Sequence, residues 1–204
     1  MPTLIVDQDL ERQLQAQRVE SGADRFDEVW DGIYVMNPMP NDQHQQLVNR
    51  FAAIFQDVID WPEIGDVRPG VNVSNSVDNW RENYRVPDVA VFLKDGAARN
   101  HGDFWHGGPD FAVEIVSTGD RTRDKLPFYG SVGVRELLLI DREPWRVELR
   151  RIEAGELRHV ANSTPDNEVV LVSDVLPFTF QMQPGAPRPQ IAVAHAVSDR
   201  RWLV

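Results

Sequence analysis

The 204-residue sequence contains no cysteine, which excludes disulfide bonds, zinc–thiolate centres and cysteine nucleophiles. It has no apolar run near the roughly 18 residues that a membrane-spanning helix needs, and its first residues lack the basic and apolar regions of a signal peptide. We therefore expect a cytoplasmic protein with no membrane partner. Positive charge is also scarce, because 21 Lys and Arg face 32 Asp and Glu, for a net charge of −11. This acidity argues against broad binding to DNA or RNA, but screening acts over roughly 10 Å, so a locally basic groove is still compatible with it.

The chain divides into three predicted parts. Residues 1–23 form an N-terminal extension that contains a short amphipathic helix over 7–20. Residues 24–182 are expected to form one domain, because 204 residues suffice for one sizeable domain, and the chain's 42% hydrophobic and 26% charged residues are ordinary for a globular protein. Residues 183–204 begin with a proline- and glycine-rich segment and are predicted to be a C-terminal tail.

Hydrophobic periodicity predicts an α/β domain with a mixed sheet. The turn signal Asp31-Gly32 predicts a hairpin over 26–36, and apolar residues at helical spacing predict a long helix to about Asp60 that Asn41 or Asp42 caps. Strands are expected near 66–73, 85–93, 110–117, 135–141 and 145–150, with further hairpin strands to about 180. The segments 72–83 and 94–109 are predicted to be loops, and a helix is expected around 123–132.

In two of these strands a single carboxylate interrupts the apolar run, Asp88 within 86–93 and Glu114 within 111–116. An unpaired buried carboxylate costs several kcal/mol, so two such residues suggest a shared partner. If the strands are neighbours, both side chains can point to the same side, and Mg²⁺ or Mn²⁺ between them would neutralise the pair and activate a water for attack on a phosphate. The alternative is that each acid is solvated at a strand end or pairs with an arginine such as Arg85.

Three cations follow the second strand closely, namely Arg121, Arg123 and Lys125. Pro127 is tolerated only in the first turn of a helix, so the next helix is expected to begin near Asp124. Lys125 would then lie in the first turn, where it can lean back toward the carboxylates and hold a phosphate oxygen. The alternative is a solvated helix start with both arginines in surface ion pairs.

The sequence resembles the Uma2 family of restriction-endonuclease-like proteins, which belongs to the PD-(D/E)XK nuclease superfamily. The resemblance covers about residues 24–180 and rests on these segments: Val86–Val89, Val113–Ser117, Gly119–Tyr129 and Gly133–Asp141. Glu28, with Asp31-Gly32 after it, and His44 also resemble the family's pattern. The resemblance implies an α/β, PD-(D/E)XK restriction-endonuclease-like core. Its mixed central sheet would be flanked by helices, with an added N-terminal helix and hairpin and added C-terminal strands.

The resemblance also implies roles for individual residues. Asp88 matches the aspartate of the motif and Glu114 its second acidic position, so both would be metal ligands, with the Ile115 carbonyl completing the metal shell. Position 116 should hold the motif's lysine but is Val116, so the lysine would come from the following helix as Lys125. Further candidates are accessory ligands or phosphate contacts at Glu28 and His44, and phosphate contacts at Arg121 and Arg123.

The expected function is Mg²⁺- or Mn²⁺-dependent hydrolysis of phosphodiester bonds in DNA by an endonuclease. A homodimer is expected by analogy, because two strands need two sites. The alternative from a different class is a catalytically inactive nuclease fold that acts as a dimerising or partner-binding module, which the acidity and Val116 favour. A small phosphorylated substrate in place of a polymer is a third option.

Overall fold

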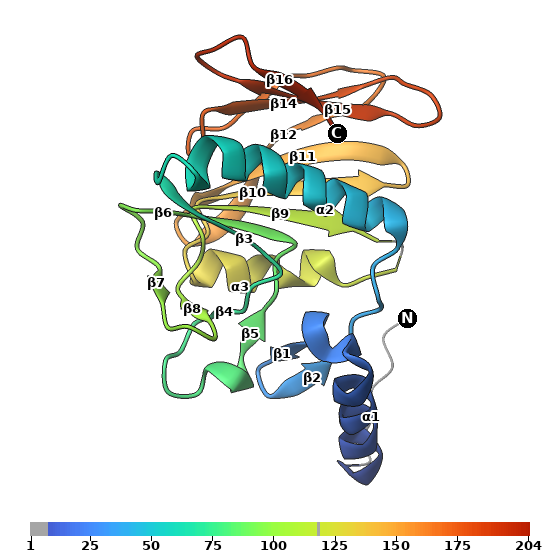
Figure 1. Ribbon diagram of the computed structural model, residues 1–204, viewed down its shortest axis with the longest axis vertical. Coiled ribbons are helices and arrows are strands. Elements are labelled where there is room, and N and C mark those ends of the chain that lie inside the picture. Colours follow the sequence, from blue (N-terminus) through green and yellow to red (C-terminus); the bar gives the residue numbers. More distant parts are fainter. Residues whose placement is uncertain (1–7, 118) are drawn as a thin grey trace.

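A mixed six-stranded sheet, in the order β12-β11-β10-β9-β6-β3, forms the centre of the computed structural model, which describes residues 8–117 and 119–204 (Figure 1). The strands of this sheet are β3 (Gly65–Pro69), β6 (Val89–Leu93), β9 (Phe111–Val116), β10 (Glu136–Arg142), β11 (Trp145–Glu153) and β12 (Glu156–Ser163). Strands β9 and β10 are parallel, and every other neighbouring pair is antiparallel. The expected mixed central sheet is therefore confirmed.

Both faces of this sheet are covered. The helix α2 (Asp42–Phe55) packs on one face, and α3 (Leu126–Ser131) packs on the other (Figure 1). Successive residues of β10 face these two layers in turn: Leu138 belongs to the core under α2, while Leu137 and Leu139 belong to the core under α3. All three are fully buried, which explains why β10 reads as a continuous apolar run.

The helix α2 forms as its sequence predicts. The Asn41 side chain caps its N-terminus by accepting a hydrogen bond of 2.9 Å from the backbone N–H of His44. Its buried residues recur at helical spacing, and they are Leu47, Val48, Phe51, Ala52, Ile54 and Phe55. The helix continues into a π-helical turn, η2 (Gln56–Asp60). The cap fixes the start of α2, and with it His44, beside the ends of β6 and β9.

The prediction that residues 183–204 form a C-terminal tail is wrong, because these residues complete a second sheet. This antiparallel sheet has the order β13-β14-β15-β16, and its strands are β13 (Leu171–Val172), β14 (Phe178–Gln183), β15 (Gln190–His195) and β16 (Arg201–Leu203). The fully buried Ile191, Val193 and Val204 join the same core as α2. The proline-rich segment is a turn between β14 and β15. The strand signal after it is the alternation of apolar residues at positions 191 and 193, which the prediction of a tail did not use.

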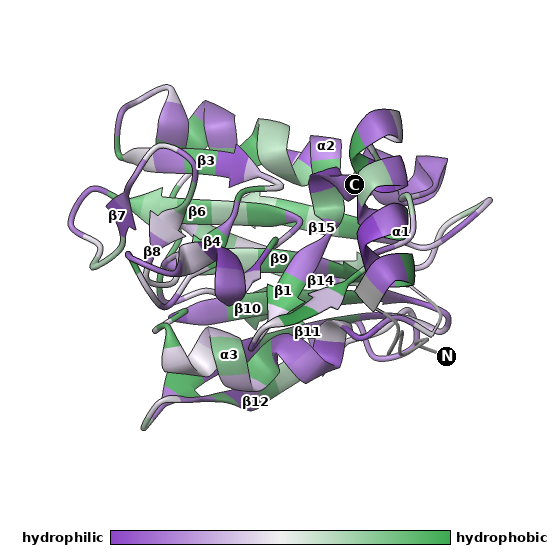
Figure 2. Cartoon of the chain, turned by 90° about the horizontal axis from the view of Figure 1, so that it is seen from below, coloured by the Kyte–Doolittle hydropathy of each residue, from purple (hydrophilic) through white to green (hydrophobic). Residues whose placement is uncertain are grey.

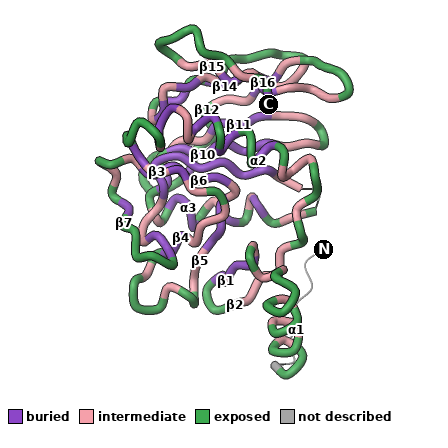
Figure 3. Tube along the Cα trace, in the orientation of Figure 1, coloured by how far each residue is buried: buried purple, intermediate pink, exposed green. Residues whose placement is uncertain are grey.

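The N-terminal part lies on the α3 side of the central sheet (Figure 1). It contains α1 (Gln8–Ser21), the 3-10 turn η1 (Ala23–Phe26) and the predicted hairpin of β1 (Glu28–Trp30) and β2 (Ile33–Val35). The apolar stripe expected on α1 is not buried, because Leu10 is 46% and Val19 62% exposed. Figure 3 shows this contrast, with α1 mostly exposed and the central strands buried. Residues 1–7 of the predicted extension lie outside the described residues.

The hairpin belongs to another six-stranded sheet, in the order β2-β1-β5-β4-β8-β7. Its other elements are β4 (Val73–Ser74), β5 (Tyr84–Arg85), β7 (Arg99–Asn100) and β8 (Trp105–His106), with the 3-10 turn η3 (Trp80–Glu82) between β4 and β5. The predicted loops 72–83 and 94–109 therefore contain short strands. Strands of two residues are too short to show an alternating pattern.

Hydrophobic colour is concentrated in the central strands β6 and β9, while α1 is largely hydrophilic (Figure 2). Within residues 8–117 and 119–204, the structure has no helix that is both long enough and apolar enough to cross a lipid bilayer.

Candidate active site

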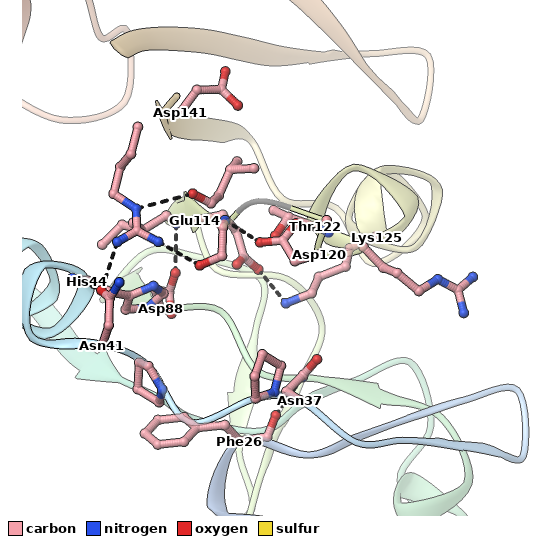
Figure 4. Close-up of a pocket in the computed structure, with 18 of the residues that line it drawn as sticks. Phe26, Asn37, Asn41, His44, Asp88, Glu114, Asp120, Thr122, Lys125 and Asp141 are labelled. Atoms are coloured by element: carbon pink, nitrogen blue, oxygen red, sulfur yellow. Dashed lines mark hydrogen bonds and ion pairs between the residues drawn. The ribbon is translucent and has the colours of Figure 1, made fainter. Parts of the chain in front are cut away.

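The two carboxylates singled out in the sequence meet at the ends of two paired strands. Strands β6 and β9 are antiparallel with Val89 opposite Val113, so the same register sets Asp88 opposite Glu114. Opposed residues of an antiparallel pair project to the same face. Asp88 Oδ2 also accepts a hydrogen bond of 2.7 Å from the backbone N–H of Ile115. The predicted convergence of positions 88 and 114 is thus present in the structure (Figure 4).

Lys125 reaches this pair from the turn that precedes α3. The turn η4 (Thr122–Lys125) leads into α3, and Pro127 lies in the first turn of that helix, as predicted. Lys125 Nζ lies 3.0 Å from Glu114 Oε1 and 2.9 Å from Glu28 Oε1. The Lys125 side chain is only 9% exposed, and two of the three N–H donors of its ammonium can face the two acids while the residue still lines the cavity.

Glu28, an accessory candidate from the sequence, is fully buried and held by three donors. Besides Lys125, its oxygens accept hydrogen bonds of 2.7 Å from the backbone N–H of Val86 and from Trp30 Nε1. These bonds fix the hairpin strand β1 beside the end of β6. Glu28 therefore holds the Lys125 ammonium next to Glu114.

Tyr129 also binds Glu114, and the sequence did not single it out as a site residue. Its hydroxyl donates to the same oxygen, Glu114 Oε1, that Lys125 contacts. The signal was available, because a spacing of four residues places 125 and 129 on one face of a helical segment.

Burial governs protonation in this cluster. It raises the pKa of Glu114 to about 8, while the Lys125 ammonium opposes this shift, and the charges of Asp88 and Glu28 reinforce it. Burial alone would lower the pKa of Lys125, but Glu114 and Glu28 outweigh it and raise the pKa above its usual value. Burial and Glu114 also raise the pKa of the Tyr129 hydroxyl, which stays a donor. The cluster thus holds a lysine cation among more acids than it can neutralise.

His44 approaches Asp88 from the first turn of α2. Its Nε2 lies 2.9 Å from Asp88 Oδ1, while its buried Nδ1 has no hydrogen-bond partner among the described residues. Asp88 is therefore held on both oxygens, by His44 and by the Ile115 N–H. His44, predicted as an accessory ligand or phosphate contact, thus lies in contact with Asp88.

His44, Asp88, Glu114 and Lys125 line a cavity of about 610 Å³. Its ionisable lining residues are five acids and four bases, apart from His44: Asp88, Glu114, Asp120, Asp141, Glu143, Arg121, Arg123, Lys125 and Arg142. Glu114 is protonated below its raised pKa, and the other four acids then match the four bases in number, so the net charge of the lining does not exclude a phosphate.

The two arginines predicted as phosphate contacts both line this cavity but are already paired. Arg123 lies 2.9 Å from Asp141 and 3.1 Å from Glu148. Arg121 lies 2.8 Å from Asp124, and its guanidinium sits 4.5 Å from the ring centre of Trp30. These contacts favour the ion-pair interpretation of the two arginines over direct phosphate binding.

The donor set suits a hard cation. Asp88, Glu114 and Ile115 all line the cavity, and carboxylate and carbonyl oxygens are the ligands that Mg²⁺ and Mn²⁺ prefer. The described residues include no group of three or more acidic, histidine or cysteine side chains arranged to hold a metal by themselves. Two carboxylates are nevertheless a usual protein share for Mg²⁺, which keeps several waters or phosphate oxygens in its shell.

Comparison with known proteins gives a consistent picture. A sequence model of the Uma2 family, described as "putative restriction endonuclease", matches residues 9–187. A crystal structure described as a "putative nuclease belonging to DUF820", from Anabaena variabilis, is similar with a TM-score of 0.56 and 18% identity, over 72% of this chain and 80% of the other. No curated protein sequence matches the chain. The structural similarity shows a restriction-endonuclease-like fold, as the sequence predicted.

Proposed function

Since the chain belongs to the Uma2 family, whose description is "putative restriction endonuclease", we propose that it hydrolyses phosphodiester bonds of DNA with the help of a divalent metal ion. The observation that carries this proposal is the meeting of Asp88 and Glu114 across the ends of β6 and β9, with the Lys125 ammonium 3.0 Å from Glu114. Acids and an ammonium that line one cavity are groups that metal-assisted phosphoryl chemistry uses.

In this proposal Asp88, Glu114 and the Ile115 carbonyl hold Mg²⁺ or Mn²⁺. When bound, such an ion lowers the pKa of water and neutralises charge on a phosphate. Lys125 stabilises the charge that develops on the phosphate oxygens, as the motif's lysine would if position 116 were not valine. His44 fixes the orientation of Asp88, and Tyr129 fixes that of Glu114.

Plasmid cleavage in the presence of Mg²⁺ or Mn²⁺ tests the proposal. The wild-type protein should nick or linearise the plasmid, whereas Asp88→Asn, Glu114→Gln and Lys125→Met should each lower the rate at least about a hundredfold, as the loss of a key electrostatic group does. The matched control is Asp95→Asn, an exposed acid in the turn after β6, which should cleave at the wild-type rate. The proposal would be contradicted if the wild-type protein failed to cut plasmid, single-stranded DNA and short oligonucleotides with either metal.

The second candidate, a non-catalytic binding module, draws support from one feature: Lys125 and Tyr129 both already occupy Glu114 Oε1. If the protein is such a module, Asp88→Asn and Glu114→Gln should leave partner binding unchanged, and the wild-type protein should not cleave DNA with any metal. We also propose a homodimer, which sedimentation analysis at several protein concentrations would detect.

A further inference from the structure

One of the four cations that line the cavity differs from the others. Arg121, Arg123 and Lys125 each lie within ion-pair distance of one or two carboxylates. Arg142, at the end of β10, donates instead to neutral oxygens in every hydrogen bond that it makes among the described residues. Neutral acceptors orient a guanidinium but do not cancel its charge, so Arg142 keeps a full positive charge at the cavity wall.

The neutral contacts hold Arg142 firmly. Its Nη1 donates to Asn41 Oδ1 at 2.8 Å, and its Nη2 donates to Ser117 Oγ at 2.8 Å. A longer bond of 3.4 Å joins Nε to the Val116 carbonyl. The side chain thus links the start of α2 to the end of β9. Nη2 carries two N–H groups and uses one for Ser117, so a second N–H is available to an oxygen of a ligand.

The position of Arg142 relates it to the acidic centre. In the parallel pairing of β9 and β10, Asp141 lies opposite Val116. Arg142 is the next residue, so it lies at the same end of the central strands at which Asp88 and Glu114 meet. Its partner Asn41 caps the helix turn that carries His44, and His44 contacts Asp88. Figure 4 shows Asn41, His44 and Asp88 gathered on one side of the cavity.

We propose that Arg142 is the phosphate-binding residue of this cavity and contacts a non-bridging oxygen of the DNA backbone. This inference rests on the proposed function and adds the residue that holds the anionic substrate beside an acidic centre. A preoriented guanidinium fits a phosphate because its planar donors match the phosphate oxygens. The arginines predicted from the sequence for this role, Arg121 and Arg123, are neutralised by Asp124 and by Asp141 with Glu148.

The test is DNA binding without cleavage. Fluorescence anisotropy with a labelled DNA duplex in EDTA, at a series of KCl concentrations, gives the affinity and its salt dependence. Arg142→Gln should weaken binding about tenfold, the effect of one charge-assisted hydrogen bond. It should also reduce the slope of log K against log salt by about one. Arg142→Lys keeps the charge and should restore the slope while recovering only part of the affinity.

The matched control is Arg146→Gln, on the neighbouring strand β11. Arg146 lies 2.8 Å from Asp141 and is absent from the cavity lining, so its loss should leave affinity and slope unchanged. Equal losses in both glutamine variants, an unchanged slope in Arg142→Gln, or no DNA binding by the wild-type protein would overturn the inference. A wild-type protein that binds DNA through Arg142 but never cleaves it would retain the inference and reject the proposed hydrolysis.

Discussion

Replacing Lys125 with methionine should expose how much the buried acids depend on one ammonium. The substitution keeps a side chain of similar length but removes the charge that Glu28 and Glu114 share. Breaking a buried ion pair by removing one partner costs about 3–5 kcal/mol, and here two carboxylates lose their partner together. For a chain of this size that loss should lower the melting temperature by about 10 °C, since each kcal/mol is worth about 2–4 °C.

The pH dependence of this loss distinguishes charge from packing. Lys125 opposes the rise in the pKa of Glu114, so its removal raises that pKa above about 8. Both proteins then carry a protonated Glu114 near pH 5 and differ only as the pH rises through about 8, so Lys125→Met should be least destabilised near pH 5 and most destabilised near pH 9. Urea unfolding at both pH values measures the difference. The double variant Lys125→Met with Glu114→Gln should recover at least about 1 kcal/mol at pH 9, because the remaining Glu28 keeps its donors from Val86 and Trp30. A loss below about 1 kcal/mol that does not change with pH would refute this reasoning, because breaking a buried pair is expected to cost several times more.

Three further predictions concern stability. The folded-state pKa of Glu114 is raised from 4.5 to about 8, so its contribution to stability is complete below about pH 4.5 and is lost as pH rises toward 8; urea unfolding should show this decline in the wild-type protein and a flatter profile in Glu114→Gln, and identical profiles would refute the shift. Asp27→Asn should cost about 3 kcal/mol and speed amide exchange at Asn37, because Asp27 is buried and accepts from Arg18, Tyr34 and Asn37; protection at Asn37 equal to that of the wild-type protein would count against it. Gly130→Ala should cost about 1–3 kcal/mol in thermal unfolding, because its Cβ would collide with the backbone of the β11–β12 turn; an unchanged melting temperature would show that this turn yields.

Local patterns predicted the elements that position the site. The alternation of side chains along strands 85–93 and 110–117 was enough to expect Asp88 and Glu114 on one face, and the register of β6 and β9 agrees. The limit that Pro127 sets on the next helix predicted that Lys125 could reach the acids from its first turn; the structure shows the contact, but with Lys125 in η4, just before α3.

The partners of these residues could not be predicted, because they come from distant parts of the chain. Glu28 meets Lys125 only after the hairpin folds against the end of β6, and no local spacing records that contact. Arg142 contacts Asn41 across about half of the sequence, so its role as a bridge becomes visible only in three dimensions. The strands over 190–204 were missed because they follow a proline-rich turn, whose composition resembles that of a tail and outweighed the apolar alternation at 191 and 193.

The most direct test of the account is isothermal titration of Mn²⁺ into the metal-free protein and into Asp88→Asn and Glu114→Gln. The account places the ion between these two carboxylates, so the wild-type protein should bind Mn²⁺ and each variant should lose that binding, while Asp95→Asn should retain it. Equal Mn²⁺ affinity in the wild-type protein and both site variants would contradict a metal centre at the ends of β6 and β9. So would a titration in which none of the four proteins releases or absorbs heat on addition of Mn²⁺.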